Sequence, residues 1–109
     1  WAHTGFSLPV DEVEHMLNTY PGLIAELSYR SGISDATAGI LHKLSDDWLR
    51  LFKRFPERFL LGSDTWVNER WDQYPQIMGS YRPWLNQLPP LVAQQIAWGN
   101  AVRLFGLKP

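Results

Sequence analysis

The chain has 109 residues, a length typical of one domain. Of these residues 45% are hydrophobic and 14% are aromatic, and the formal net charge is -1, which is a globular composition. This charge balance gives no reason to expect nucleic acid or an anionic membrane as a partner, and no apolar stretch approaches the roughly 20 residues that a membrane helix needs. The sequence has no cysteine, which excludes disulfides and thiolate metal sites.

The opening residues, Trp1 to His3, are strand-like and are closed by Thr4 and Gly5. They form neither the basic region nor the apolar region of a signal peptide. We therefore expect the sequence to begin inside a longer protein, part-way along a buried strand. Processing of a precursor would give the same start.

Apolar spacing predicts two helices in the first half of the chain. The first follows Pro9, and its apolar face consists of Val10, Val13, Met16, Leu17 and Tyr20. For the second, Ser45 is the expected N-cap, and Asp46 and Asp47 lie in the first turn, where the helix dipole favours negative charge. Its apolar face consists of Trp48, Leu51, Phe52 and Phe55, and Pro56 ends it.

Two further short apolar runs, Leu23–Ser28 and Phe59–Gly62, are strand candidates. The chain therefore alternates strand and helix, and its strands are short and apolar, as in a parallel sheet that is covered on both faces. Three such units fit an α/β sheet or part of a (β/α)8 barrel. A whole barrel takes about 250 residues, so this chain would supply less than half of one.

The last third of the chain is predicted to be mostly loop and short helix. Residues 67–87 are rich in tryptophan and proline and are expected to form a loop with one short helix. Pro89 and Pro90 suit a helix start. Gly99 should interrupt that helix, Asn100 should cap a final short one, and Gly106 should close it.

Polar side chains follow each predicted strand: His3, then Glu26 and Ser28, then Asp64. Functional groups gather at the carboxyl ends of the strands in parallel α/β folds, so we expect these residues at one rim. Imidazole and carboxylate both bind zinc and similar divalent ions. Two ligands are too few, however, because a catalytic zinc usually has about three protein ligands and a water. A turn cap for Asp64 and a hydrogen-bonded strand-end histidine are the alternatives.

Four stretches, "WAHTGF", "LIAELSYR", "RFPERFLLGSDTW" and "IAWGNAVRLFGL", together resemble the C-terminal part of the amidohydrolase-related, metal-dependent hydrolases with a TIM-barrel fold. The resemblance runs in order through nearly the whole chain. Each stretch alone is a weak indication of the family, whereas the occurrence of all four in this order is a more specific one. It implies the C-terminal portion of a TIM (β/α)8 barrel, about three βα units, in which residues 1–109 form one partial domain with strands six to eight, truncated at the N-terminus.

The resemblance also implies roles for two residues. His3 would end strand six, and Asp64 would be the aspartate that ends strand eight. A bound divalent ion, zinc in our expectation, would lower the pKa of a water, and Asp64 would accept its proton and pass it to the leaving group. His3 would bind the metal or stabilise charge on the substrate oxygen. The family's His-x-His pair of strand one and its strand-five ligand have no counterpart here.

The sequence therefore predicts part of a cytoplasmic, metal-dependent hydrolase that acts on a small organic substrate and is inactive as this chain alone. A homo-oligomer is expected of the full-length protein. A metal-dependent decarboxylase or hydratase of the same family is a close alternative, because the residues present here are shared by both. A non-catalytic small α/β interaction domain is the third possibility, and it would unfold in urea as a cooperative monomer.

The remaining candidates are interpreted as structural. A strand carboxylate near an arginine, here Glu26 and Arg30, is more often an ion pair than a substrate contact. His15 lies in a helix pattern and His42 in irregular chain, and neither replaces a missing ligand. The aromatic residues Trp66, Trp71 and Tyr74 could wall a substrate pocket, although packing is the commoner role, and Trp84 and Trp98 are expected in the core.

Overall fold

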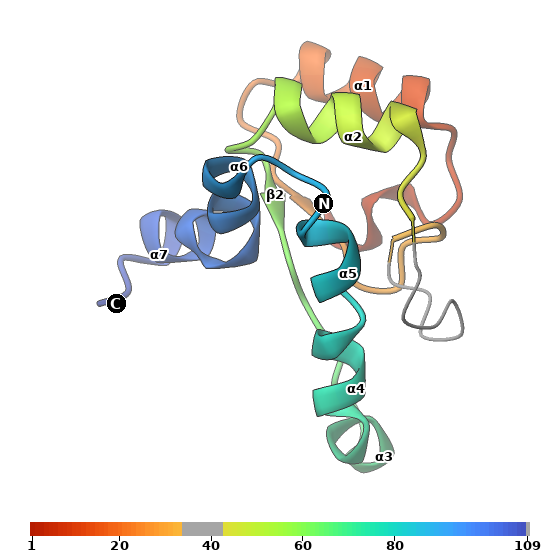
Figure 1. The fold of residues 1–109 in the computed structure, drawn as a ribbon, viewed down its shortest axis with the longest axis vertical. Helices are drawn as coiled ribbons and strands as arrows, with labels where there is room; N and C mark the ends of the chain where they lie inside the picture. Colours follow the sequence, from red (N-terminus) through yellow and green to blue (C-terminus); the bar gives the residue numbers. More distant parts are fainter. Residues whose placement is uncertain (34–42, 109) are drawn as a thin grey trace.

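The structure is a computed structural model, and it describes residues 1–33 and 43–108. Figure 1 shows helices grouped around a very small central sheet. The strands β1 (Ala25–Glu26) and β2 (Phe59–Leu60) pair in parallel, with Ala25 opposite Phe59 and Glu26 opposite Leu60. Ala25 and Phe59 are fully buried, so the sheet lies in the core.

Helices α1 (Val10–Thr19) and α2 (Asp46–Arg54) lie side by side on one side of the sheet (Figure 1). Both confirm the helices predicted from apolar spacing. Val13 and Leu17 of α1 are buried, and the Ser45 hydroxyl accepts a hydrogen bond from the Trp48 N–H at 3.3 Å, as an N-cap does. On the outer surface, Glu14 of α1 forms ion pairs with two arginines of α2, Arg50 and Arg54.

The segment after β2 contains three short helices instead of one: α3 (Asn68–Asp72), α4 (Tyr74–Gly79) and α5 (Arg82–Leu85). They follow one another as a column that projects from the rest of the molecule (Figure 1). Only the near end of the column reaches the core, where Tyr81 and Trp84 are fully buried. Trp84 stacks on Phe52, with ring centroids 5.2 Å apart, and this contact ties the column to α2.

The C-terminal helices are continuous. Helix α6 (Pro90–Gln94) leads into a wide π-turn, η2 (Gln95–Gly99), and then into α7 (Asn100–Phe105). The start at Pro90 and the left-handed Gly106 after the last turn, with φ of 62°, are as predicted. The predicted interruption at Gly99 and the cap at Asn100 are wrong, because both residues have helical dihedral angles.

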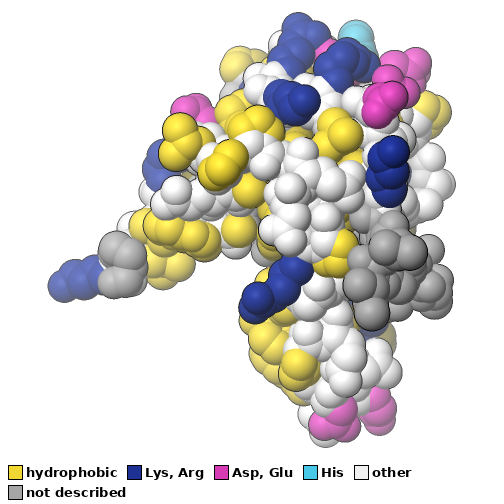
Figure 2. All heavy atoms as spheres, viewed as in Figure 1, with side chains coloured by type: hydrophobic (Ala, Val, Ile, Leu, Met, Phe, Trp, Pro, Cys, Tyr) yellow, Lys and Arg dark blue, Asp and Glu magenta, His cyan; other side chains and the backbone are white. Residues whose placement is uncertain are grey.

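Asn100 instead holds the C-terminal helices against β2. Its side chain is 2% exposed, and its amide nitrogen donates to the carbonyls of Pro56 at 2.8 Å and Phe59 at 2.9 Å. The opposite face of these helices is open to solvent, and Figure 2 shows hydrophobic side chains gathered there. The exposed apolar residues of this segment are Leu91, Trp98, Leu104, Phe105 and Leu107. Trp98, which was expected in the core, is 47% exposed.

The expectation of three βα units from the C-terminal portion of a TIM barrel is wrong, although the chain is mixed α/β. The described residues contain one sheet of two strands, each two residues long, and just over half of the described residues are in short helices. The predicted first strand fails for a local reason. Residues Ala2–Gly5 form a 3₁₀ turn, η1, in which His3 and Thr4 have positive φ, so the backbone pairing with β1 is made by Trp1.

Candidate functional site

Three chain segments end at one edge of the small sheet. Trp1 continues the parallel pairing beside β1, because its amino terminus donates to the Ile24 carbonyl at 2.7 Å and its carbonyl accepts from the Glu26 N–H at 2.9 Å. The segments that follow Trp1, β1 and β2 carry His3, Ser28 and Asp64. Each of these polar residues therefore follows the carboxyl end of an extended segment, which is where α/β proteins bind ligands.

The His3 imidazole is held by one of its two nitrogens. Nδ1 lies 2.8 Å from the Ser28 carbonyl oxygen and 3.2 Å from the Ser28 hydroxyl. A carbonyl only accepts, so Nδ1 carries the proton, and Nε2 of the neutral ring keeps its lone pair. Nε2 makes no hydrogen bond with any residue that the structure describes, and the side chain is 24% exposed. The free nitrogen can therefore bind a metal ion or accept a proton.

Glu26 organises the chain around His3. Its Oε1 accepts the Ser28 N–H at 2.7 Å, and its Oε2 accepts the His3 N–H at 3.2 Å and the Ser28 hydroxyl at 2.9 Å. Oε2 is also 3.9 Å from His3 Nδ1. The carboxylate thus joins the end of β1 to the turn η1. Sequence reasoning noted Glu26 and Ser28 at a strand end but missed this contact with His3; their shared strand face was the available signal.

Asp64 lies after β2 with a positive φ of 51°. Its backbone is fixed by Arg70, whose Nε donates to the Asp64 carbonyl at 2.6 Å and whose Nη2 donates to the Ser63 carbonyl at 2.9 Å. The carboxylate itself makes no hydrogen bond or ion pair with the described residues. It is therefore free to act as a base or a ligand.

The two predicted site residues, His3 and Asp64, are linked indirectly. The Arg70 guanidinium lies over the Tyr29 ring, 5.7 Å from its centroid, and the Tyr29 ring lies 6.1 Å from the His3 ring. Phe6 completes an aromatic group, with its centroid 5.0 Å from that of His3. Phe6 and Tyr29 are 55% and 60% exposed, so this edge presents apolar surface beside the polar groups.

Backbone strain is concentrated at the same edge. Within residues 1–33 and 43–108, the non-glycine residues with positive φ are His3, Thr4, Phe6, Tyr29 and Asp64. Such a conformation costs of order 1–3 kcal/mol per residue, and it persists only where the surroundings enforce it. Strained residues of this kind cluster at ligand sites and active sites, which supports a functional interpretation of this edge.

The donor set fits a metal ion only in part. His3 Nε2 and the Asp64 carboxylate are suitable donors for zinc. Across the described part of the chain, however, no three His, Cys, Asp or Glu side chains lie together as a group that could hold a metal ion. Any further ligands would have to come from outside the described residues.

The other predicted roles have different outcomes. Glu26 and Arg30 do not form the expected ion pair, because Glu26 turns to Ser28 and His3. Arg30 is 3% exposed, donates to the Phe6 and Leu8 carbonyls, and lies 5.1 Å from the Trp48 ring centroid. Burial lowers the pKa of its guanidinium.

Of the other two histidines, His15 is exposed on α1, and His42 lies outside the described residues. The aromatic residues after Asp64 do not pack into the core: Trp66, Trp71 and Tyr74 are 77%, 59% and 41% exposed, and the last two stack on each other.

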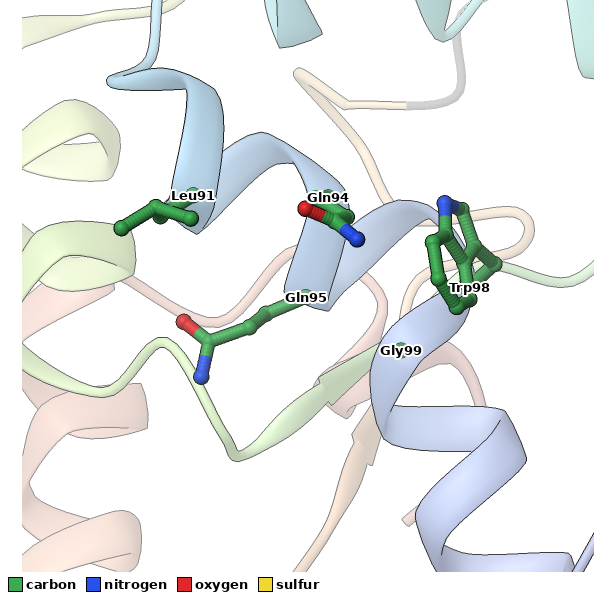
Figure 3. A pocket seen from close by; sticks show the side chains of 5 residues that line it. All are labelled: Leu91, Gln94, Gln95, Trp98 and Gly99. Carbon is green, nitrogen blue, oxygen red and sulfur yellow. The ribbon is translucent and has the colours of Figure 1, made fainter.

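A pocket of about 360 Å³ lies on the C-terminal helices, next to the π-turn (Figure 3). It is lined by Leu91, Gln94, Gln95, Trp98 and Gly99. These side chains include neither an imidazole nor a carboxylate, so the pocket offers no acid, base or strong metal ligand. The edge that carries His3 is the better candidate for chemistry.

No protein-family model matches this chain, and no curated protein or solved structure matches it significantly. The family resemblance described above therefore stays an expectation. Within the described residues, no helix has both the length and the apolar character needed to cross a membrane.

Proposed function

We propose that this chain supplies His3 and Asp64 to a metal-dependent hydrolytic site for a small organic substrate. The observation that carries the proposal is the orientation of His3: Nδ1 is bound to the Ser28 carbonyl at 2.8 Å, and Nε2 has no hydrogen-bond partner among the described residues. Metal-binding histidines commonly donate their other ring nitrogen to a carbonyl or carboxylate in this way.

Each side chain has a distinct part in such a site. His3 Nε2 and the Asp64 carboxylate would hold a divalent ion such as zinc together with ligands from outside the described residues. When bound, the ion would supply a water of lowered pKa. Asp64, whose carboxylate has no partner in the described chain, would accept a proton from the attacking water and return it to the leaving group. Phe6 and Tyr29 would flank the apolar part of the substrate.

Zinc titration of the ¹⁵N-labelled chain, followed by NMR, tests the proposal. We expect zinc to perturb the His3 ring first, and we expect His3→Ala and Asp64→Asn to weaken binding by at least about tenfold, because even the loss of a residue that only orients a ligand has an effect of about this size. His15→Ala is the matched control, because His15 is exposed on α1, and it should leave the affinity unchanged. Equal zinc binding by His3→Ala and the parent chain would refute the proposal.

A further inference from the structure

The Glu26 carboxylate is nearly saturated with donors from two separate segments. It accepts the N–H groups of His3 and Ser28 and the Ser28 hydroxyl, at 3.2, 2.7 and 2.9 Å. Each oxygen of the carboxylate therefore accepts from a backbone N–H. An ionised carboxylate is the one side chain of this size that can accept at both oxygens, whereas an amide must place a donor at one of them.

These hydrogen bonds also set the direction of the contacts around His3. Because the Ser28 hydroxyl donates its proton to Glu26, it presents a lone pair to His3 Nδ1, 3.2 Å away. The Ser28 carbonyl, 2.8 Å from the same nitrogen, can only accept. Both neighbours of Nδ1 are therefore acceptors, and the proton of a neutral imidazole is held on Nδ1.

We propose that Glu26 is a positioning residue that fixes the tautomer and the orientation of the His3 ring, so that Nε2, which makes no hydrogen bond with the described residues, keeps its lone pair. The inference deepens the proposed function, on which its biological meaning rests. Glu26 acts through Ser28 and through the backbone of η1, and it need not touch a substrate or a metal. Gly62 supports the arrangement, because a Cβ there would overlap Glu26 Oε1 and lie 2.9 Å from Cδ.

The test is ¹⁵N NMR of the histidine rings at a pH of about 8, where an ordinary imidazole is neutral. In the parent chain we expect His3 to be protonated on Nδ1 alone. In Glu26→Gln the ratio of the two tautomers should shift by about tenfold, because the amide places a donor against one of the two N–H groups and one hydrogen bond to a charged group is lost. Glu57→Gln, at an exposed carboxylate, is the matched control and should leave the spectrum of His3 unchanged.

The outcomes below decide the proposal, and Ser28→Ala and a zinc titration are the two additional measurements. If the parent chain shows His3 protonated on Nε2, the proposal is overturned without any variant, and it is also overturned if Glu26→Gln keeps both its fold and the parent tautomer. Ser28→Ala retains the carbonyl contact and should largely preserve the tautomer. Zinc titration is read separately: a fixed Nδ1–H tautomer without zinc binding would refute the proposed function and leave the role of Glu26 intact.

Discussion

The Glu26 carboxylate occupies the space that a side chain at Gly62 would need. A Cβ at Gly62 would overlap Glu26 Oε1 and lie 2.9 Å from its Cδ. Glu26 cannot move aside freely, because its hydrogen bonds hold His3 and Ser28. The lack of a side chain at Gly62 is therefore coupled, through Glu26, to the geometry of the His3 ring on η1.

Gly62→Ala should displace Glu26 and destabilise the chain by about 1–3 kcal/mol, the usual cost of overpacking a filled site. Urea unfolding measures the change. Gly79→Ala is the control, because a Cβ there meets nothing within 4 Å and the residue lies in α4. It should be neutral or slightly stabilising, since alanine favours helix over glycine. A neutral Gly62→Ala would show that Glu26 does not hold its position.

Asn100→Asp should be among the most damaging single changes in the C-terminal helices. The substitution replaces an amide that donates to the Pro56 and Phe59 carbonyls with a buried oxygen that faces two acceptors. We expect a loss of about 2–4 kcal/mol at neutral pH, and a smaller loss at acidic pH where the new carboxyl is protonated. Thermal unfolding at two pH values would reveal it. Asn86→Asp, at an exposed position, should change stability by less than about 0.5 kcal/mol.

Arg30→Met tests the buried guanidinium. The change removes donors to the Phe6 and Leu8 carbonyls and the contact with the Trp48 ring, while much of the aliphatic volume stays. We expect a loss of about 2–3 kcal/mol in unfolding free energy. Arg50→Met removes only surface ion pairs, with Glu14 of α1 and Asp47 of α2, and should cost less than about 1 kcal/mol. Equal effects of the two changes would contradict the role assigned to Arg30.

Ser45→Ala removes the N-cap of α2. The hydroxyl accepts from the Trp48 N–H at 3.3 Å, so the alanine variant should lose about 1 kcal/mol of stability, and Ser45→Asp should retain most of it. Circular dichroism during thermal unfolding gives the comparison. Ser7→Ala, at an exposed position outside any helix, should have no measurable effect.

The helices α1 and α2 could be predicted because their information is local. The spacing of Val13 and Leu17 shows the buried face of α1, and Ser45 marks the start of α2, so no distant contact is needed to place either. The two strands lie where the runs around Ala25 and Phe59 predicted them, but each is shorter than predicted, because the length of a strand depends on its pairing partner. Only two residues of each run pair as strand.

The remaining errors come from long-range contacts and from backbone strain. Nothing near Asn100 in the sequence indicates that its amide reaches Pro56 and Phe59, so a helix cap was the natural interpretation. The left-handed His3 likewise donates its N–H to Glu26, 23 residues away, a contact that its neighbours in the sequence do not indicate. His3 could be chosen as a site residue from its place after an apolar start. Its tautomer could not be predicted, because it depends on the Ser28 carbonyl and on Glu26, which are both distant in the sequence.

The π-turn between α6 and α7 has a consequence for how this chain tolerates change in length. A turn of this kind accommodates one more residue than a regular helical turn. Because the surplus residue is taken up by the wide turn, deleting one residue from Gln95–Gly99 would let the two helices run on as a regular α-helix with nearly the same rotational phase, so Asn100 should still face the Phe59 carbonyl. A deletion within a regular turn of α7 would instead rotate the residues that follow it by about 100°, so the π-turn is the place in the C-terminal helices where the loss of one residue is best tolerated.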